Sequence, residues 1–155
     1  KDDSPEWLSW RHAINFVKKL EKDENFNFIS LPTTSPLKTK ENVRKCIRIF
    51  NKNKYDTLFT ISKTNLNPNY NMVFKNRGKF FFNKKLKNKL NFRSKFQQSY
   101  FISTLLFIAK PNFIKKKKSL FDGKFKLVEF DPISSIDIDT ELDLKLAKIM
   151  YEKKY

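Results

Sequence analysis

Apolar and polar positions repeat along the chain with two periods, and these periods predict its helices and strands. Apolar side chains recur every three or four positions from Trp7 to Val17, as on the buried face of a helix. Ser4 and Pro5, just before them, are residue types that begin helices. By the same criteria, and from short apolar runs bounded by turn residues, we expect helices over residues 39–51 and after Thr140, and strands at residues 26–31, 56–62, 100–109, 124–129 and 136–139.

Two further segments complete the predicted organisation. Residues 72–82 predict a β-hairpin that turns at Asn76-Arg77-Gly78, and a basic, irregular segment follows at residues 84–99. Strands that alternate with helices predict an α/β sandwich with a mostly parallel sheet. A length of 155 residues fits a single domain over residues 1–155.

The net charge changes this picture less than its size suggests. A formal charge of +17 and a pI near 9.9 are typical of proteins that bind nucleic acid. However, Lys, Asn, Phe and Ile are abundant together while Gly occurs only twice, as a coding bias towards A/T would produce. The lysines are also spread along the chain, apart from the run at Lys115 to Lys118. A nucleic-acid-binding domain is therefore kept as an alternative, and not as the main prediction.

Several classes of protein are excluded by what the chain lacks. No run of about 18 uninterrupted apolar residues exists, so no membrane span is predicted. Cys46 is the single cysteine and the chain opens on polar residues without a signal peptide, which predicts a cytoplasmic location. His12 is the single histidine, so His-rich metal sites and Ser-His or Cys-His catalysis are disfavoured.

The most informative segment is residues 135–143, which carries two acids in alternation. Ile136, Asp137, Ile138 and Asp139 have the period of a half-buried strand, which places both carboxylates on one face, roughly 6.6 Å apart along the backbone. Thr140 follows as an N-cap, with Asp143 completing a capping-box pattern. Ligands bind at the carboxyl ends of strands in open α/β sheets, and two carboxylates there suit Mg²⁺. The alternative is a pair of solvated or helix-capping acids.

A second candidate segment lies at residues 31–38, between a predicted strand and a predicted helix. Thr34 and Ser35 supply hydroxyls and Lys38 supplies a charge next to a helix N-terminus, where anions are favoured. The alternative is an ordinary turn that caps the next helix. From spacing alone, that alternative is the simpler interpretation.

These motifs resemble one protein family. Ser-Ile-Asp-Ile-Asp-Thr-Glu-Leu-Asp at residues 135–143 resembles the closing motif of the acylneuraminate cytidylyltransferases, the CMP-sialic acid synthetase family. Thr34-Ser35-Pro36-Leu37 matches that family's Leu-Gln-Pro-Thr-Ser-Pro-Leu-Arg segment. Residues 67–73 are similar to a segment of legionaminic- and pseudaminic-type members, and Arg93 to Tyr100 resembles their Arg-Gln-x-x-Pro-x-x-Tyr.

The chain departs from the family pattern at two places that concern the sugar. Pro32 stands where sialic acid synthetases have a glutamine that contacts the sugar, and Lys38 stands where they have arginine. The resemblance therefore implies a related eight- or nine-carbon keto-sugar acid in place of sialic acid itself.

The resemblance implies a Rossmann-like nucleotidyltransferase sandwich with a β-hairpin dimerisation arm at about residues 72–100, and hence a homodimer. It implies transfer of CMP from CTP to a 2-keto-3-deoxy, nonulosonic-type sugar acid, with release of pyrophosphate. Site roles follow residue by residue. They are Mg²⁺ ligands at Asp137 and Asp139, a sugar-carboxylate clamp at Arg93, substrate contacts at Thr34, Ser35 and Lys38, and a nucleotide contact at Ser4.

The resemblance covers the family's C-terminal two-thirds. The family's first third holds a glycine-rich loop that grips the CTP phosphates, and no counterpart is found among these 155 residues. We therefore expect this chain alone to be an incomplete, inactive piece of the enzyme. The remaining alternatives are a non-catalytic remnant that binds sugar or dimerises, and the basic nucleic-acid-binding domain.

Overall fold

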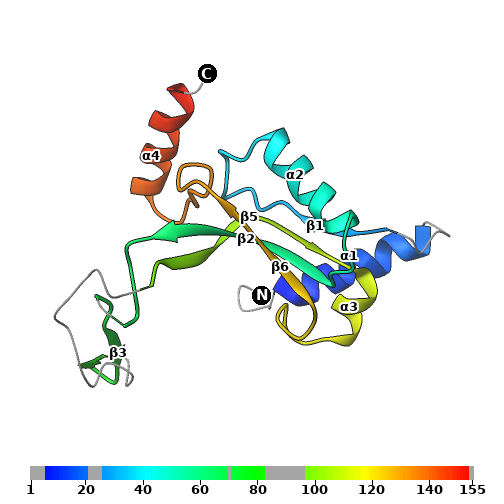
Figure 1. Cartoon of the computed structure of the whole chain (residues 1–155), viewed down its shortest axis with the longest axis horizontal. Coiled ribbons are helices and arrows are strands. Elements are labelled where there is room, and N and C mark those ends of the chain that lie inside the picture. The colour runs from blue at the N-terminus through cyan, green and yellow to red at the C-terminus, as the bar shows by residue number, and fades with distance from the viewer. Residues whose placement is uncertain (1–5, 21–25, 70, 83–96, 154–155) are drawn as a thin grey trace.

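The computed structural model describes residues 6–20, 26–69, 71–82 and 97–153. Its body is a four-stranded sheet in the order β1-β5-β2-β6 with helices on both faces, and a two-stranded hairpin lies away from that body (Figure 1). None of the described helices is long and apolar enough to cross a membrane. In chain order the elements are α1 (Glu6–Leu20), β1 (Phe28–Ser30), α2 (Lys40–Asn51), β2 (Thr57–Thr64), β3 (Phe74–Asn76), β4 (Lys79–Phe81), β5 (Ser99–Ala109), α3 (Pro111–Lys116), β6 (Phe125–Phe130) and α4 (Glu141–Glu152).

The α/β class is confirmed, while the expected strand arrangement needs a correction. β5 pairs antiparallel with both β1 and β2, and β2 pairs parallel with β6. Three strands, β1, β2 and β6, thus share one direction, but two of the three neighbouring pairs are antiparallel. The reason is that the chain leaves β2, passes through the β3–β4 hairpin and returns beside β2 as β5, and such a return produces an antiparallel neighbour.

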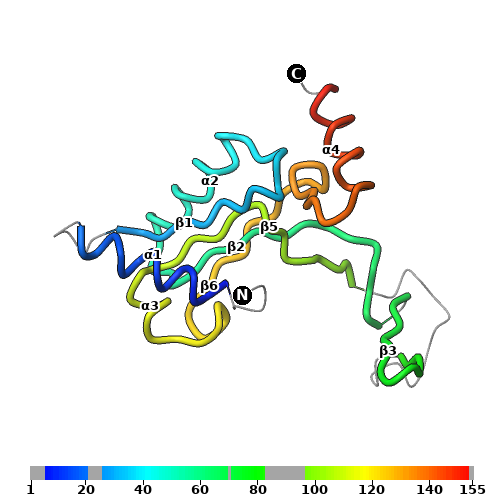
Figure 2. Tube along the Cα trace, turned by 180° about the vertical axis from the view of Figure 1, so that it is seen from behind, coloured from blue at the N-terminus to red at the C-terminus, as the bar shows by residue number. Residues whose placement is uncertain are grey.

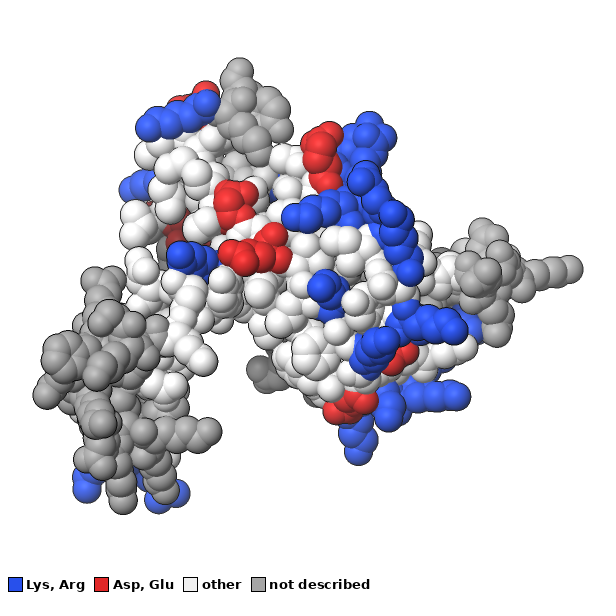
Figure 3. Space-filling model, in the orientation of Figure 1, with Lys and Arg blue, Asp and Glu red and all other residues white. Residues whose placement is uncertain are grey.

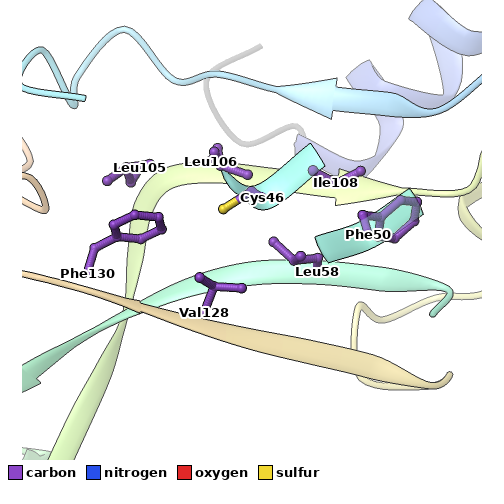
Figure 4. Close-up of a cluster of buried hydrophobic side chains, with 8 residues drawn as sticks. All are labelled: Cys46, Phe50, Leu58, Leu105, Leu106, Ile108, Val128 and Phe130. Carbon is purple, nitrogen blue, oxygen red and sulfur yellow. The ribbon is translucent and has the colours of Figure 1, made fainter. Parts of the chain in front are cut away.

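Two hydrophobic clusters lie on opposite faces of the sheet. Neighbouring residues of a strand point to opposite faces, so Leu58 packs towards α2 while Phe59 packs towards α1 and α3. Figure 4 shows the first cluster, in which Cys46 and Phe50 of α2 lie over side chains of β2, β5 and β6. Burial raises the pKa of the Cys46 thiol to about 11, so this cysteine is a protonated packing group.

On the other face, Trp10 and Ile14 of α1 are buried against the sheet, which confirms the middle of the predicted apolar stripe, whereas Ala13 and Val17 of that stripe are exposed. The tube view in Figure 2 shows α1 and α3 together on this side, opposite α2. The two helices are also tied at their ends, because Trp7 Nε1 and Arg11 both donate hydrogen bonds to the carbonyl of Lys117. The two clusters together fix the sheet between three helices.

β5 contains a large bulge opposite the middle of β2. Phe59 pairs with Phe107 whereas the next residue, Thr60, pairs with Ser103, so residues 104–106 of β5 have no counterpart on β2. The buried Thr60 hydroxyl donates to the Ser103 carbonyl at 3.0 Å and accepts from the Ser103 hydroxyl at 2.7 Å. Bulges bend strands, and beyond this one β2 and β5 run away from the body towards the β3–β4 hairpin (Figure 1).

The predicted hairpin is confirmed. β3 and β4 pair antiparallel with Asn76 opposite Lys79, which leaves Arg77 and Gly78 as a two-residue loop. Both loop residues have positive φ, 47° and 77°, as a type I′ hairpin turn requires. All residues of both strands are exposed, including stacked Phe74 and Phe81. The hairpin thus keeps its own pairing without packing its aromatic rings into the core.

Candidate functional site

The acid-bearing segment forms a loop between β6 and α4, which corrects the strand expected at residues 136–139. β6 ends at Phe130, and Asp131 then closes a tight turn by accepting hydrogen bonds from the Ser134 amide (2.9 Å) and hydroxyl (2.7 Å). Residues 136–138 continue without a strand partner. The apolar–acidic alternation therefore belongs to a partly buried loop and not to a strand paired in a sheet.

The capping-box prediction for α4 is confirmed. The Thr140 hydroxyl accepts from the Asp143 amide, and the Asp143 carboxylate accepts from the Thr140 amide at 2.8 Å. Asp143 also accepts from the Thr140 hydroxyl at 2.7 Å, and this hydrogen bond lowers the pKa of Asp143. Asp143 is thus occupied with starting the helix, which leaves Asp137 and Asp139 as the acids available to a ligand.

The loop at residues 31–38 is held together by buried polar groups. Ser35 is fully buried and its Oγ lies 2.7 Å from Thr104 Oγ1, in the bulge of β5. Lys38 Nζ donates to the carbonyl oxygens of Pro32 (2.6 Å) and Ser35 (2.5 Å). Thr39 then caps α2 in a capping box with Asn42. The structure thus shows the helix-capping turn that was the alternative interpretation, while the binding of an anion by this loop stays a prediction.

The structure brings the two candidate loops together. The Ile138 amide donates to the Thr34 carbonyl at 2.8 Å, so the segment with Asp137 and Asp139 lies directly against the segment with Thr34, Ser35 and Lys38. In Figure 3, acidic side chains gather where the loop after β6 meets α4, while a ridge of Lys and Arg covers α2. Two segments a hundred residues apart in the chain thus form one polar edge of the molecule.

The two acids differ in their surroundings. Asp137 is half-buried, and its Oδ1 is buried with no hydrogen-bond partner among the described residues. Asp139 is exposed. Burial lowers the pKa of Lys38, and the negative charge of Asp137 partly opposes that shift. A half-buried carboxylate with an unpaired oxygen beside an exposed carboxylate can bind a cation.

A divalent cation fits this donor set if water or phosphate oxygens complete its coordination. Within the described part of the chain, no group of three or more His, Cys, Asp or Glu side chains could hold a metal. Asp137 and Asp139 would therefore supply two oxygens, and water or phosphate oxygens would supply the rest. Mg²⁺ is commonly held in this way, by one or two carboxylates together with substrate phosphates.

Two predicted site residues, Arg93 and Ser4, lie outside the described residues. Conversely, the structure shows two site residues to which the sequence assigned no role. Thr104 holds Ser35, and Ser135 has a buried hydroxyl without a partner in the described structure. Thr104 had a signal in the sequence, a hydroxyl in the otherwise apolar run of residues 100–109, whereas Ser135, which lies among other polar residues, had none.

An apolar groove of about 200 Å³ adjoins the polar edge. It lies between the loop that precedes α2 and the outer part of α4, and its wall includes Pro36, Leu37, Ile138, Ala147 and Tyr151. Ile138 belongs both to this groove and to the contact with Thr34. The polar edge therefore has an apolar flank.

Comparisons with known proteins agree with the fold and with the motifs. No family model matches the chain. The fold is similar to that of a solved structure, 4-diphosphocytidyl-2C-methyl-D-erythritol synthase from Anaerococcus prevotii, with a TM-score of 0.61 and 18% identity, over 97% of this chain and 68% of that one. The chain is also similar to the post-translational flagellin modification protein B of Campylobacter coli, with 25% identity over 144 residues, 93% of this chain.

These likenesses confirm the resemblance to the cytidylyltransferases. The chain spans 60% of the length of the Campylobacter coli protein. Because the match covers only part of that protein, the activity of this chain is proposed from the residues described above.

Proposed function

We propose that this chain is part of a cytidylyltransferase that joins CMP from CTP to a sialic-acid-like 2-keto-3-deoxy sugar acid and releases pyrophosphate. The observation that carries the proposal is the hydrogen bond between the Ile138 amide and the Thr34 carbonyl. It places the two motifs that resemble this family next to each other, with the unpaired Asp137 oxygen at their junction. The fold of a nucleotidyltransferase supports the same assignment.

In this proposal the protein mainly orients the reactants, because phosphoryl transfer depends on positioning and charge neutralisation. Asp137 and Asp139 would hold Mg²⁺, which supplies charge neutralisation at the phosphates. The loop with Thr34, Ser35 and Lys38 would face the sugar acid. The buried Ser35 hydroxyl contributes by fixing this loop to Thr104.

Arg93 would bind the sugar carboxylate, since a guanidinium binds a carboxylate through two parallel hydrogen bonds. Ser4 would contact the nucleotide. The chain would work as a homodimer through the arm at about residues 72–100, whose described hairpin exposes Phe80 and Phe81. By itself this chain would be inactive, because the glycine-rich loop that the family uses for the CTP phosphates has no counterpart here.

The test is CTP-dependent pyrophosphate release with Mg²⁺ and a panel of eight- and nine-carbon keto-sugar acids. We would compare this chain with a version extended at its N-terminus by a family-type segment that carries the glycine-rich loop. Release from the extended version, lost in Asp139→Asn and kept in the matched variant Glu129→Gln, supports the proposal. Glu129 is an exposed acid of β6, so both variants remove one negative charge from the surface. A folded extended version that is silent with every sugar acid counts against it.

One observation favours a second candidate function, nucleic-acid binding. Residues 57–121 contain fifteen Lys and Arg residues and no Asp or Glu. The same range includes the hairpin with its exposed aromatic side chains. Cations interleaved with aromatic rings bind single-stranded nucleic acid through phosphates and stacked bases. Affinity for random single-stranded DNA that falls by orders of magnitude between 50 and 200 mM salt would support this candidate.

A further inference from the structure

Lys38 uses its ammonium group inside its own loop. Nζ donates to the Pro32 carbonyl at 2.6 Å and to the Ser35 carbonyl at 2.5 Å, so two of its three protons are bound by the backbone. The side chain is partly buried. A lysine that contacts a substrate phosphate or carboxylate needs those protons for the ligand. In this structure, Lys38 instead closes residues 32–38 into a ring.

The ring determines where the Thr34 carbonyl points. Thr34 lies between Pro32 and Ser35, the two residues whose carbonyls bind Lys38. Ser35 is further fixed, because its amide donates to the Pro32 carbonyl and its hydroxyl bonds Thr104. The Thr34 carbonyl is then free to accept from Ile138 at 2.8 Å. A short chain of hydrogen bonds therefore joins Lys38 to the residue that follows Asp137.

The position of Asp137 depends on these backbone contacts, because no hydrogen bond to its buried Oδ1 is found among the described residues. In contrast, the Asp131 carboxylate accepts two hydrogen bonds from Ser134, and the Asp143 carboxylate accepts two from Thr140. The charges of Lys38 and Asp137 also act on each other across the junction. The orientation of Asp137 thus comes from the backbone at Ile138 and from the ring behind it.

We infer that Lys38 is a positioning residue: it holds the Thr34 carbonyl against the Ile138 amide and so fixes the backbone that carries Asp137, one of the two carboxylates proposed to bind a cation. The inference rests on the proposed function for the presence of that cation, but not for the positioning itself. It differs from the direct substrate contact that the family resemblance implies for Lys38.

The first test is hydrogen exchange at the Ile138 amide, measured by NMR on this chain. We expect Lys38→Met to speed exchange of that amide at least tenfold, while amides of β2 and β5 keep their rates. Lys38→Arg should restore most of the protection, because a guanidinium can donate to both carbonyls. Lys40→Met is the matched control, since Lys40 is exposed at the start of α2 and loses the same charge. Unchanged exchange at Ile138 in Lys38→Met would overturn the inference.

Thr104→Val provides a second route if Lys38→Met does not fold. It removes the partner of Ser35 without touching Lys38, so it should loosen the same ring and speed Ile138 exchange to a smaller extent. A Thr104→Val protein with wild-type exchange at Ile138 would likewise contradict the ring as the support of this amide.

The second test is the affinity for Mn²⁺ alone, measured by water proton relaxation. Removing a positive charge near a cation site strengthens cation binding if charge is all that matters. Positioning predicts the opposite, at least threefold weaker binding in Lys38→Met and near wild-type binding in Lys38→Arg. Tighter binding in Lys38→Met would overturn the inference. If the wild-type chain binds no Mn²⁺ without substrate phosphates, the two carboxylates do not form a cation site by themselves, and the exchange measurement alone supports or overturns the role of Lys38.

Discussion

The loop junction and the hairpin treat polar and apolar side chains in opposite ways. At the junction, small polar groups are buried: Ser35 is 0% exposed and Ser135 is 2% exposed. In the hairpin, large aromatic groups are exposed: Phe80 is 71% exposed and Phe82 is 55% exposed. The buried Ser35 hydroxyl is held by Thr104 within the chain, whereas exposed aromatic rings are typical of surfaces that bind another molecule. The junction is therefore built within one chain, and the hairpin is suited to a partner.

The largest difference between these regions should appear when a phenylalanine is truncated. Phe59 is buried between α1, α3 and the sheet, so Phe59→Ala should lower the free energy of unfolding by about 3–5 kcal/mol. Phe80→Ala should change it by less than about 0.5 kcal/mol, as is usual for an exposed side chain. Urea denaturation measures both. Equal losses would mean that the hairpin packs as part of the core.

A smaller loss is expected at the bulge that leads from one region to the other. Thr60→Val keeps the shape of the side chain but leaves the Ser103 hydroxyl and carbonyl without their partner. An unsatisfied buried polar group costs about 1–3 kcal/mol, so we expect a loss of about 2 kcal/mol in urea denaturation. Thr64→Val is the control, because the Thr64 hydroxyl accepts from the Leu66 amide at an exposed position. A neutral Thr60→Val would show that the bulge does not need this hydroxyl.

At the start of α4, Thr140→Ala should cost about 1 kcal/mol of helix stability, the usual effect of losing an N-cap. The same cap gives a pH dependence. The hydrogen bond from Thr140 lowers the pKa of Asp143 in the folded chain below its ordinary value of 3.8. The resulting stabilisation is therefore present above pH 3.8 and is lost as the pH falls through the lowered pKa. Hydrogen exchange of α4 amides should show this loss in the wild type and a smaller one in Thr140→Ala, because the Thr140 and Asp139 amides still donate to Asp143 there.

The smallest effect on stability and the clearest effect on association should come from the hairpin. The double variant Phe80→Ser, Phe81→Ser should unfold like the wild type. In sedimentation velocity it should be a monomer at concentrations where the wild type dimerises. Phe121→Ser is the matched control, because Phe121 is similarly exposed but lies outside the arm, against Phe59 and Phe125. A monomeric wild type, or dimers in the double variant, would contradict the arm as an interface.

The sequence predicts the elements of this fold better than their arrangement. Helices, the hairpin turn and both capping boxes follow local rules, so Thr140 and Gly78 could be assigned from their neighbours in the chain. The direction of β5 beside β2 could not, because a strand's partner depends on how the intervening chain returns. The bulge at Thr60 was also missed, since it depends on contacts between strands forty residues apart.

The same division applies to the site. The residue types of Asp137 and Lys38 mark them as candidates, and the family resemblance gives them roles. The sequence pattern does not predict that the Asp137 oxygen is buried or that Lys38 binds two backbone carbonyls, because both depend on the folded arrangement of the loops. The alternation of apolar and acidic residues at 136–139 predicts a strand, but a partly buried loop can carry the same alternation.

The two edges of the sheet have a practical consequence for handling the protein. β6, at one edge, carries Lys126 and Glu129 among its residues, and charges discourage another strand from adding there. β1, at the other edge, is Phe28-Ile29-Ser30 and is uncharged, with β5 as its partner in the described sheet. An uncharged edge is where another strand could add, and in this chain the short length of β1, three residues, is what limits such pairing. A lysine at position 29 would be the first substitution to try for a sample that stays clear.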